Sequence, residues 1–523
     1  MTTKRDLRFF NTTGPCNPDE HYMLPPEERL VGAQLHRYIK DKLYWVLHAP
    51  RQTGKTTFLQ SWMREINAGN EALACYVSVE ACQGISEIEL AIPSICVAIR
   101  EFAATYGLPV PPMPDSVLPY SMLSLILGSW AKMIAPKPLV VLFDETDVLQ
   151  DAALISFLRQ LREGFSRRGP GSFPVSIALV GMRDLKDYIT ASKGGVAPNP
   201  GSPFNIKEDS AILSNFSRED IATLFAQRRA ESGQQITTEA LDYVYEQSKG
   251  QPWIVNSLFK RSTMRVLDKE STETVTLAHI EKARQQMILA RETHLDALAI
   301  RLREPQIRHI IEPILTGESN PELAESDAFR QCIDLGLVAI ERGTPVIANP
   351  IYREVIARHL TYGQQLAIPE PAWQWEKDDG SLDMDRLMIE FQNFWRRHSD
   401  IWETKTAYTE AFPHLLLMAF LQRVLNGGGR IEREYAAGRG RMDLGVEYKG
   451  IWYIIEIKLV HSYDTFQTVR DEGLEQIRSY RDKLAPGAPA WLVIFDRRAQ
   501  TREKSWDERI SREEMGDIFV LGC

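Results

Sequence analysis

The sequence lacks the cysteine spacing of a metal site or a disulfide framework. Its 523 residues include six cysteines, which lie far apart and form no C-x-x-C pair, so neither a zinc site nor a disulfide scaffold is indicated. Residues 1–14 contain no apolar core of a secretion signal, and no apolar run of about 18 residues occurs in the chain. We therefore expect a cytoplasmic protein without a membrane partner.

The sequence also has no excess of positive charge. Its 61 lysines and arginines are outnumbered by 70 aspartates and glutamates, and the formal net charge is −9. Nucleic-acid binding would therefore depend on local basic patches and active-site metal rather than on overall charge. With 44% hydrophobic and 25% charged residues, the composition is that of a globular protein, and the length predicts several domains.

The strongest motif lies within Leu43–Phe58, LYWVLHAPRQTGKTTF. The apolar run at its start predicts a buried parallel strand, followed by a tight loop and a helix that opens at Gly54. In such a loop the backbone N–H groups converge on a phosphate, a lysine reaches the β- and γ-phosphates, and a hydroxyl holds Mg²⁺. Lys55 and Thr56 would take the last two roles. The expected ATP-binding set is Arg51, Gln52, Thr53, Gly54, Lys55, Thr56 and Thr57.

The loop departs from G-x-x-x-x-G-K-[ST] at its first position, where Ala49 replaces glycine, and Pro50 removes one N–H donor. Neither change affects the donors of Gly54–Thr57, so we expect ATP binding to be retained. The Asn-, Pro- and Gly-rich segment Phe9–Leu30 is expected to be irregular and placed to lie over the nucleotide base.

A second nucleotide signal is the run Leu139–Asp147, LVVLFDETD. It predicts a buried parallel strand with two acids at its carboxyl end, where ligands bind in open α/β sheets. Asp144 would coordinate the nucleotide's Mg²⁺, and Glu145 would polarise the attacking water. The alternative is a strand followed by a helix cap, a position that aspartate also favours.

A third apolar strand, Val175–Gly181, is followed by Arg183. A cation at this strand end is expected to sense the γ-phosphate, and the alternative is a surface salt bridge. From Asn215 onward the pattern is helical. Residues 306–360 then predict helices followed by a hairpin at 337–347, which is typical of a winged-helix module. Because this segment is not strongly basic, a regulatory lid is favoured over a DNA-binding element.

These motifs together resemble the signal-transducing branch of AAA+-related ATPases, often called STAND, over residues 5–365. In that family the proline of a G-x-P motif lies near the nucleotide, which implies this role for Pro252 in Gly250-Gln251-Pro252. The resemblance also implies that the nucleotide sets a closed or open arrangement of ATPase and winged helix, and that this arrangement controls an attached effector.

The effector is expected beyond the linker Thr361–Ser381, which is rich in proline, aspartate and glycine. Helices at Met384–Arg397 and Glu410–Leu425 lead into a compact α/β pattern. Its expected strands are Arg430–Tyr435, Met442–Tyr448, Ile451–Leu459 and Ala490–Phe495, and its helix is Glu472–Leu484.

Three residues of this α/β pattern carry chemistry. Because side chains alternate along a strand, Glu456 and Lys458 share one face while Ile457 points into the core. Asp443 and Glu456 beside one ammonium group would form a Mg²⁺ site, with Mn²⁺ as a second suitable metal, for phosphodiester hydrolysis. The alternative is a solvated face with cross-strand ion pairs.

Gln476 and Tyr480 lie four residues apart on the expected helix and would share one face. With Asp443 and the Glu456-x-Lys458 pair, they resemble the RecB-type branch of the PD-(D/E)XK nuclease superfamily over residues 405–500. That branch also uses an acid from its first helix, which implies Glu410, with Glu434 as a second candidate.

We therefore predict an α/β multidomain chain. Its expected parts are a P-loop ATPase (1–210), a helical lid (211–300), a winged helix (301–365), a linker with a helix (366–403) and a small restriction-endonuclease-like nuclease (404–523). The favoured function is an ATP-regulated, Mg²⁺-dependent nuclease acting on DNA rather than RNA, in bacterial defence or mobile-element biology. Homo-oligomerisation and a protein trigger are implied by resemblance.

Two other functions remain open at this point. The first is a nucleotide-dependent switch or adaptor whose nuclease-like module only binds nucleic acid or protein. The second is a remodelling motor, against which the sequence shows no clear translocation loop and no basic groove.

Overall fold

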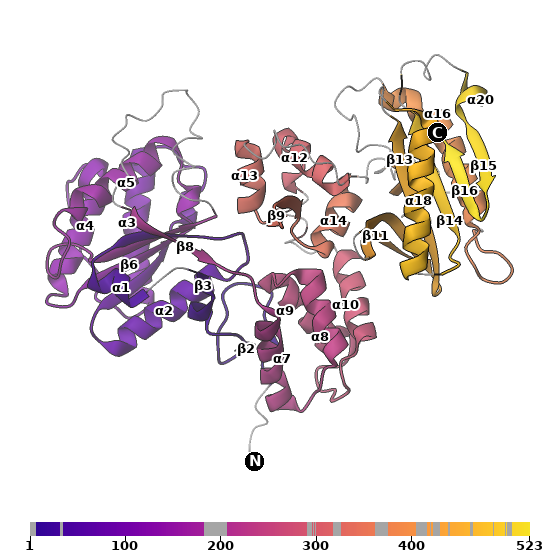
Figure 1. Cartoon of the computed structure of the whole chain (residues 1–523). Coiled ribbons are helices and arrows are strands. Elements are labelled where there is room, and N and C mark those ends of the chain that lie inside the picture. Colours follow the sequence, from indigo (N-terminus) through magenta and orange to yellow (C-terminus); the bar gives the residue numbers. More distant parts are fainter. Residues whose placement is uncertain are drawn as a thin grey trace. The chain divides into compact units, whose positions relative to one another are not determined.

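The computed structural model divides into two compact units, Met1–Asp296 with Glu322–Tyr352, and Ala297–Pro321 with Arg353–Cys523. Each unit is described by itself (Figure 1). The described residues are 7–31, 35–182, 207–289, 295, 298, 300–316, 326–360, 375–403, 416–418, 420–421, 429–437, 440–460, 464–484, 486–496, 498 and 505–523. In this part of the chain, no helix is both long and apolar enough to cross a membrane.

The first unit is built on a six-stranded sheet with the strand order β3-β8-β4-β7-β6-β5. All neighbouring pairs are parallel except the edge pair β3 and β8. Strand β7 therefore lies between β4, which leads into the predicted phosphate loop, and β6, which ends in the predicted acids. The strands are β3 (Leu30–Val31), β4 (Tyr44–His48), β5 (Leu73–Ser78), β6 (Leu139–Asp144), β7 (Ser176–Gly181) and β8 (Lys207–Leu213).

Alternation along β6 produces a hydrophobic core on each face of this sheet. Val140 and Leu142 pack in the cluster that contains Trp62 of α2, whereas Val141 and Phe143 pack in the cluster of α3, α4 and α5. Figure 1 shows the sheet between these two helical layers. The helices are α1 (Leu35–Lys40), α2 (Lys55–Gly69), α3 (Ile88–Thr105), α4 (Pro119–Met133) and α5 (Asp151–Phe165).

A short strand, β3, precedes the first helix of this unit. Leu30 and Val31 pair with Leu213 and Ile212 of β8, and the helix starts at Leu35. Strand β8 itself was not predicted, because its first residues, Lys207-Glu208-Asp209, are charged and hide the apolar part of the strand.

Four helices and an N-terminal pair of short strands complete the larger segment of the first unit. Phe10 of β1 packs against Phe225 of α7 and Phe259 of α9, which ties the N-terminal segment to the helices. The elements are β1 (Phe9–Phe10), β2 (His21–Tyr22), α7 (Arg218–Ser232), α8 (Thr238–Ser248), α9 (Pro252–Arg261) and α10 (Leu277–Leu289). The smaller segment contains α13 (Asp327–Asp334) and the predicted hairpin, β9 (Val338–Glu341) with β10 (Thr344–Ile347).

The second unit contains a mixed sheet with the order β11-β12-β13-β14-β16-β15. Strands β11, β12 and β13 are antiparallel neighbours, β13, β14 and β16 are parallel, and β15 returns antiparallel to β16. The last two strands were not predicted. The strands are β11 (Gly429–Ala437), β12 (Gly440–Tyr448), β13 (Ile451–Val460), β14 (Ala490–Asp496), β15 (Ser511–Met515) and β16 (Ile518–Gly522).

Helix α18 (Phe466–Leu484) connects β13 to β14 and packs on the sheet through Leu474 and Ile477. Helix α16 is held at the end of the sheet, where Gln392 Nε2 donates to the carbonyl oxygen of Gly522 at 2.6 Å. The remaining helices described are α12 (Pro305–Thr316), α14 (Pro350–Leu360), α16 (Met384–Glu403) and α20 (Trp506–Arg509).

Gly473 allows α18 to approach β14 closely. A Cβ atom at this position would lie 2.6 Å from Leu492 Cδ1, so Gly473→Ala is expected to lower the free energy of unfolding by about 1–3 kcal/mol through overpacking. Denaturant unfolding measures this change. Glu475→Ala, an exposed position on the same helix, serves as the control, and equal stability of the two variants would contradict the close packing.

Candidate functional site

A large cavity in the first unit collects most of the predicted nucleotide residues. Its volume is about 810 Å³, and the phosphate loop, the end of β6, the N-terminal segment and the start of α9 contribute to its wall. The predicted residues among its lining are Arg51, Gln52, Thr53, Gly54, Lys55, Thr56, Thr57, Asp144, Glu145 and Pro252.

The loop between β4 and α2 has the bent backbone of a phosphate cradle. Gln52 and Gly54 adopt positive φ angles of 58° and 96°, and α2 begins directly after Gly54 without a side-chain cap. The ammonium group of Lys55 donates to the carbonyl oxygens of Ala49 and Pro50, at 2.7 and 2.9 Å. Burial lowers the pKa of Lys55. The loop thus presents a helix N-terminus and a partly buried ammonium group, a combination that suits a phosphate.

Thr56 and Asp144, the predicted Mg²⁺ pair, are in direct contact. The Thr56 hydroxyl donates to Asp144 Oδ2 at 2.7 Å, and the Tyr76 hydroxyl lies 3.2 Å from the same oxygen. Asp144 is only 1% exposed, and burial raises the pKa of its carboxyl group. A hydroxyl and a carboxylate at this spacing are oxygen donors that suit Mg²⁺ bound beside phosphates.

Glu145 lies beside this pair in a strained backbone conformation with φ of 58°. Burial, together with the nearby acids Glu80, Asp144 and Asp147 and against the opposing charge of Arg51, raises the pKa of its carboxyl group to about 7. A general base works best when its pKa is close to the working pH. The environment of Glu145 therefore suits the predicted role of activating water.

The pKa of Glu145 predicts a pH profile for ATP hydrolysis. Since the deprotonated carboxylate is the active base, kcat should rise about tenfold between pH 6 and pH 8, with its midpoint close to neutrality. Steady-state phosphate release at saturating ATP measures this profile. Glu80→Gln removes one of the acids that raise the pKa and should move the midpoint to lower pH. A profile that falls over this range would contradict the assignment.

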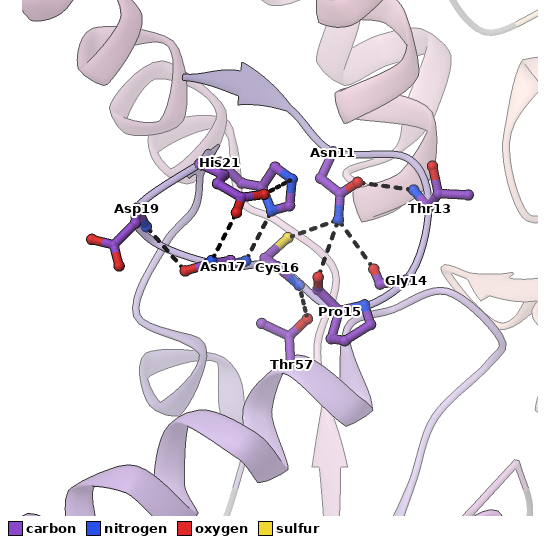
Figure 2. A network of polar contacts seen from close by, with 10 residues as sticks. Asn11, Thr13, Gly14, Pro15, Cys16, Asn17, Asp19, His21 and Thr57 are labelled. Atoms are coloured by element: carbon purple, nitrogen blue, oxygen red, sulfur yellow. Dashed lines mark hydrogen bonds and ion pairs between the residues drawn. The ribbon is translucent and has the colours of Figure 1, made fainter. Parts of the chain in front are cut away.

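The N-terminal segment lies against the first turn of α2, as Figure 2 shows. The backbone N–H of Cys16 donates to Thr57 Oγ1 at 3.0 Å, and Asn11 Nδ2 donates to the carbonyl oxygen of Gly14 at 3.1 Å. On the α9 side, Trp253 Nε1 donates to the carbonyl oxygen of Thr12 at 3.0 Å. This segment therefore joins the phosphate loop to α9 across the cavity.

The G-x-P turn also reaches the phosphate loop. Gln251 accepts a hydrogen bond from the N–H of Ile254 at 2.7 Å, and its Nε2 donates to the carbonyl oxygen of Gln52 at 3.4 Å. Pro252 is buried at the first position of α9. Arg183, the predicted γ-phosphate sensor, lies outside the described residues.

Arg29 is a cavity residue that the sequence did not indicate. It contributes to the same wall, but a lone arginine in a proline-rich segment belongs to no recognisable motif. The only sequence feature that indicated a role for this segment at the nucleotide was the Asn-, Pro- and Gly-rich composition of Phe9–Leu30.

The second candidate site lies on β13. Lys458 Nζ is 3.0 Å from Glu456 Oε1, and the side chains are 22% and 2% exposed. This contact confirms that the two residues share one face of the strand. Ile457 is buried, as predicted.

The register of β12 and β13 brings the other predicted acid to this position. Leu444 of β12 pairs with Ile455 of β13. Asp443 precedes Leu444 and Glu456 follows Ile455, so in this antiparallel register the two acidic residues occupy neighbouring positions on adjacent strands. Gln476 is exposed on α18. The side chains of Asp443, Glu434 and Tyr480, and all of Glu410, lie outside the described residues.

A divalent metal fits the described part of this site. The described side chains form no cluster of three or more His, Cys, Asp or Glu, yet Glu456 supplies a buried carboxylate beside an ammonium group. Carboxylate oxygens are preferred ligands of Mg²⁺ and Mn²⁺. The remaining ligand would come from Asp443.

Comparison with known protein families gives a match in the C-terminal part of the chain. Residues 408–492 match the PD-(D/E)XK nuclease superfamily, which confirms the predicted C-terminal module. No curated protein matches the sequence.

Solved structures similar to the chain include a Walker-type ATPase, Cdc6p and a branch migration motor. The Walker-type ATPase PABY2304 of Pyrococcus abyssi shares 13% identity, covering 66% of this chain and 99% of that one, with a TM-score of 0.49. Cdc6p of Pyrobaculum aerophilum shares 13% identity over 63% and 91%, with a TM-score of 0.35. The RuvB Holliday junction branch migration motor of Thermotoga maritima shares 14% identity over 61% and 90%, with a TM-score of 0.32. The first unit therefore has a parallel α/β sheet with a phosphate-loop geometry, and residues 408–492 near the C-terminus match the PD-(D/E)XK nuclease superfamily.

Proposed function

We propose that this protein is an ATP-regulated, metal-dependent nuclease that hydrolyses phosphodiester bonds. The observation that carries the proposal is that one chain holds two charged centres of different chemistry. Thr56 contacts Asp144 at 2.7 Å in the first unit. In the second unit, Lys458 contacts the buried Glu456 at 3.0 Å, within a segment that matches a nuclease superfamily.

At the ATP site, each residue has a role that follows from its contacts. Thr56 and Asp144 would hold Mg²⁺, which neutralises charge on the phosphates when it is bound. Lys55 carries the ammonium group that would move from the loop carbonyls to the phosphate chain. Glu145, with a pKa of about 7, would orient a water molecule and accept its proton.

At the nuclease site, Asp443 and Glu456 would hold the metal, which supplies Lewis acidity toward the phosphodiester. The Lys458 ammonium group is held by Glu456 and would orient the attacking water and stabilise the extra negative charge of the transition state. Gln476 and Tyr480 on α18 would contact the nucleic acid, and Glu410 would contribute a further acid.

One contact supports regulation of the ATPase by the hairpin segment. Gly336, just before β9, approaches Pro50 of the phosphate loop so closely that a Cβ atom at 336 would lie 2.8 Å from Pro50 Cβ. Pro50 is one of the two departures from the usual loop sequence. The hairpin segment is therefore placed to respond to the conformation of this loop, as the predicted STAND-like lid would.

We further propose DNA as the substrate, a homo-oligomeric active form and a role in bacterial defence, possibilities raised by the STAND and RecB-type resemblances. The test is a panel of plasmid DNA, linear DNA and RNA of matched length, each with Mg²⁺ or Mn²⁺ and with ATP, ADP or no nucleotide. We expect metal-dependent cleavage of DNA whose rate depends on the nucleotide. Nucleotide binding without cleavage of any substrate would instead support the switch or adaptor.

A further inference from the structure

Arg29 is an almost fully buried cation on the wall of the nucleotide cavity. Its residue exposure is 6%. Nε and Nη2 donate to the carbonyl oxygen of Ser214 at 3.0 and 2.5 Å, and Nη2 also donates to the carbonyl oxygen of Thr53 at 2.8 Å. The guanidinium group lies 4.7 Å from the ring centre of Phe216. Two of its nitrogens are therefore fixed by the phosphate loop and by the end of β8.

The third nitrogen, Nη1, faces the phosphate loop. It lies 3.3 Å from the position that a Cβ atom would take at Gly54, and both residues line the cavity. No hydrogen bond to Nη1 is formed within the described ranges, whereas every hydrogen bond of Nε and Nη2 goes to a backbone carbonyl.

Arg29 forms no hydrogen bond to a carboxylate in the described part of the chain, although the negative charge of Asp220 acts on it electrostatically. Burial outweighs this effect and lowers the pKa of Arg29 to about 10, so the group is still charged at neutral pH. A buried cation bonded only to neutral carbonyls is costly unless an anion pairs with it. An anion that enters the cavity beside Gly54 would supply this missing partner.

The surroundings of Arg29 are rigid enough to hold Nη1 in place. The N–H of Phe216 donates to the carbonyl oxygen of Gly250 at 2.8 Å. Gly250 has a φ of 74°, and a Cβ atom there would lie 1.9 Å from the Phe216 carbonyl oxygen. This close backbone contact fixes the ring that covers the guanidinium group.

We propose that Arg29 is a phosphate-binding residue, and that Nη1 pairs with the phosphate chain of the nucleotide while Lys55 binds it from the loop. This inference rests on the proposed ATP site. It adds a cation that comes from the N-terminal segment rather than from the phosphate-loop motif. A charge-assisted hydrogen bond of this kind changes affinity by about tenfold or more.

The test compares the affinities of the full-length protein for ATP, ADP and adenosine by calorimetry, with and without Arg29→Gln. We expect ATP and ADP to bind at least about tenfold more weakly to the variant, and adenosine affinity to change less than twofold. Arg29→Lys, which keeps the charge, should restore part of the loss. Arg37→Gln, on the exposed face of α1, is the matched control.

Each outcome decides between binding and mere structural support. Equal losses for adenosine and ATP would show that Arg29 only shapes the cavity, and unchanged ATP affinity would also overturn the proposal. If Arg29→Gln fails to fold, the comparison of the three ligands is made with Arg29→Lys, for which ADP must lose more affinity than adenosine. Failure of the unaltered protein to bind ATP would instead refute the ATP site itself.

Discussion

Replacing Lys458 with alanine is expected to lower the rate of DNA cleavage by about 10²–10³-fold, because under the proposed function the variant loses a charge that would stabilise the transition state. Lys458 Nζ lies 3.0 Å from Oε1 of Glu456, and the side chains are 22% and 2% exposed. The ammonium group is therefore largely shielded from solvent. In such an environment its charge acts more strongly than it would at the protein surface. Initial rates of plasmid relaxation with Mg²⁺ measure the effect.

Two further variants separate chemistry from stability at this site. Lys449→Ala removes an exposed lysine of the turn between β12 and β13 that pairs with Glu376, and it should leave cleavage unchanged. Glu456→Gln keeps the shape of the buried side chain and should also lower cleavage strongly, because it removes the carboxylate proposed to bind the metal. Cleavage by Lys458→Ala at the rate of the unaltered protein would refute the assignment of the nuclease site.

Replacing Lys55 with alanine is expected to weaken ATP binding by about a hundredfold or more, because the variant lacks the partly buried ammonium group that would pair with the phosphates. Its present contacts are the carbonyl oxygens of Ala49 and Pro50, which are neutral and easily exchanged for phosphate oxygens. Titration with a fluorescent ATP analogue measures the loss.

Lys132→Ala is the matched control for this experiment, since Lys132 is exposed on α4 and lies outside the cavity lining. It should bind ATP like the unaltered protein. Retained binding by Lys55→Ala would show that the departure at Ala49 and Pro50 has changed how the loop works.

The parts of the fold that the sequence predicted are those whose apolar pattern is continuous. Residues Leu139–Phe143 of β6 are all buried. Because side chains alternate along the strand, Val140 and Val141 pack into the cores on opposite faces of the sheet. Strand β8 escaped prediction because it starts with charged residues. Its pairing with β4 depends on distant parts of the chain, which local patterns do not contain.

The same distinction applies to the candidate sites. The proximity of Thr56 and Asp144 could be predicted from the sequence. Thr56 follows one buried parallel strand and Asp144 ends another, and the carboxyl ends of these strands share one edge of the sheet. Glu456 and Lys458 followed from the two-residue period of a strand. Arg29 could not be found in this way, because its position beside Gly54 depends on the contacts of an irregular segment with Thr53 and Ser214.

We expect the nucleotide bound in the first unit to control the nuclease centre of the second unit. Gly336 approaches Pro50 of the phosphate loop, and the N-terminal segment joins Thr57 to α9. The nucleotide would therefore act on several elements of the first unit at once. Nuclease activity in the second unit is expected to depend on whether that nucleotide is present.

The most direct measurement is the ratio of DNA cleavage rates with and without ATP, determined for the unaltered protein and for Lys55→Ala under the same Mg²⁺ concentration. We predict a ratio clearly different from one for the unaltered protein and a ratio of one for the variant, and Lys458→Ala should lower cleavage by about 10²–10³-fold both with and without ATP. A cleavage rate that is insensitive to ATP in the unaltered protein would contradict nucleotide control of the nuclease.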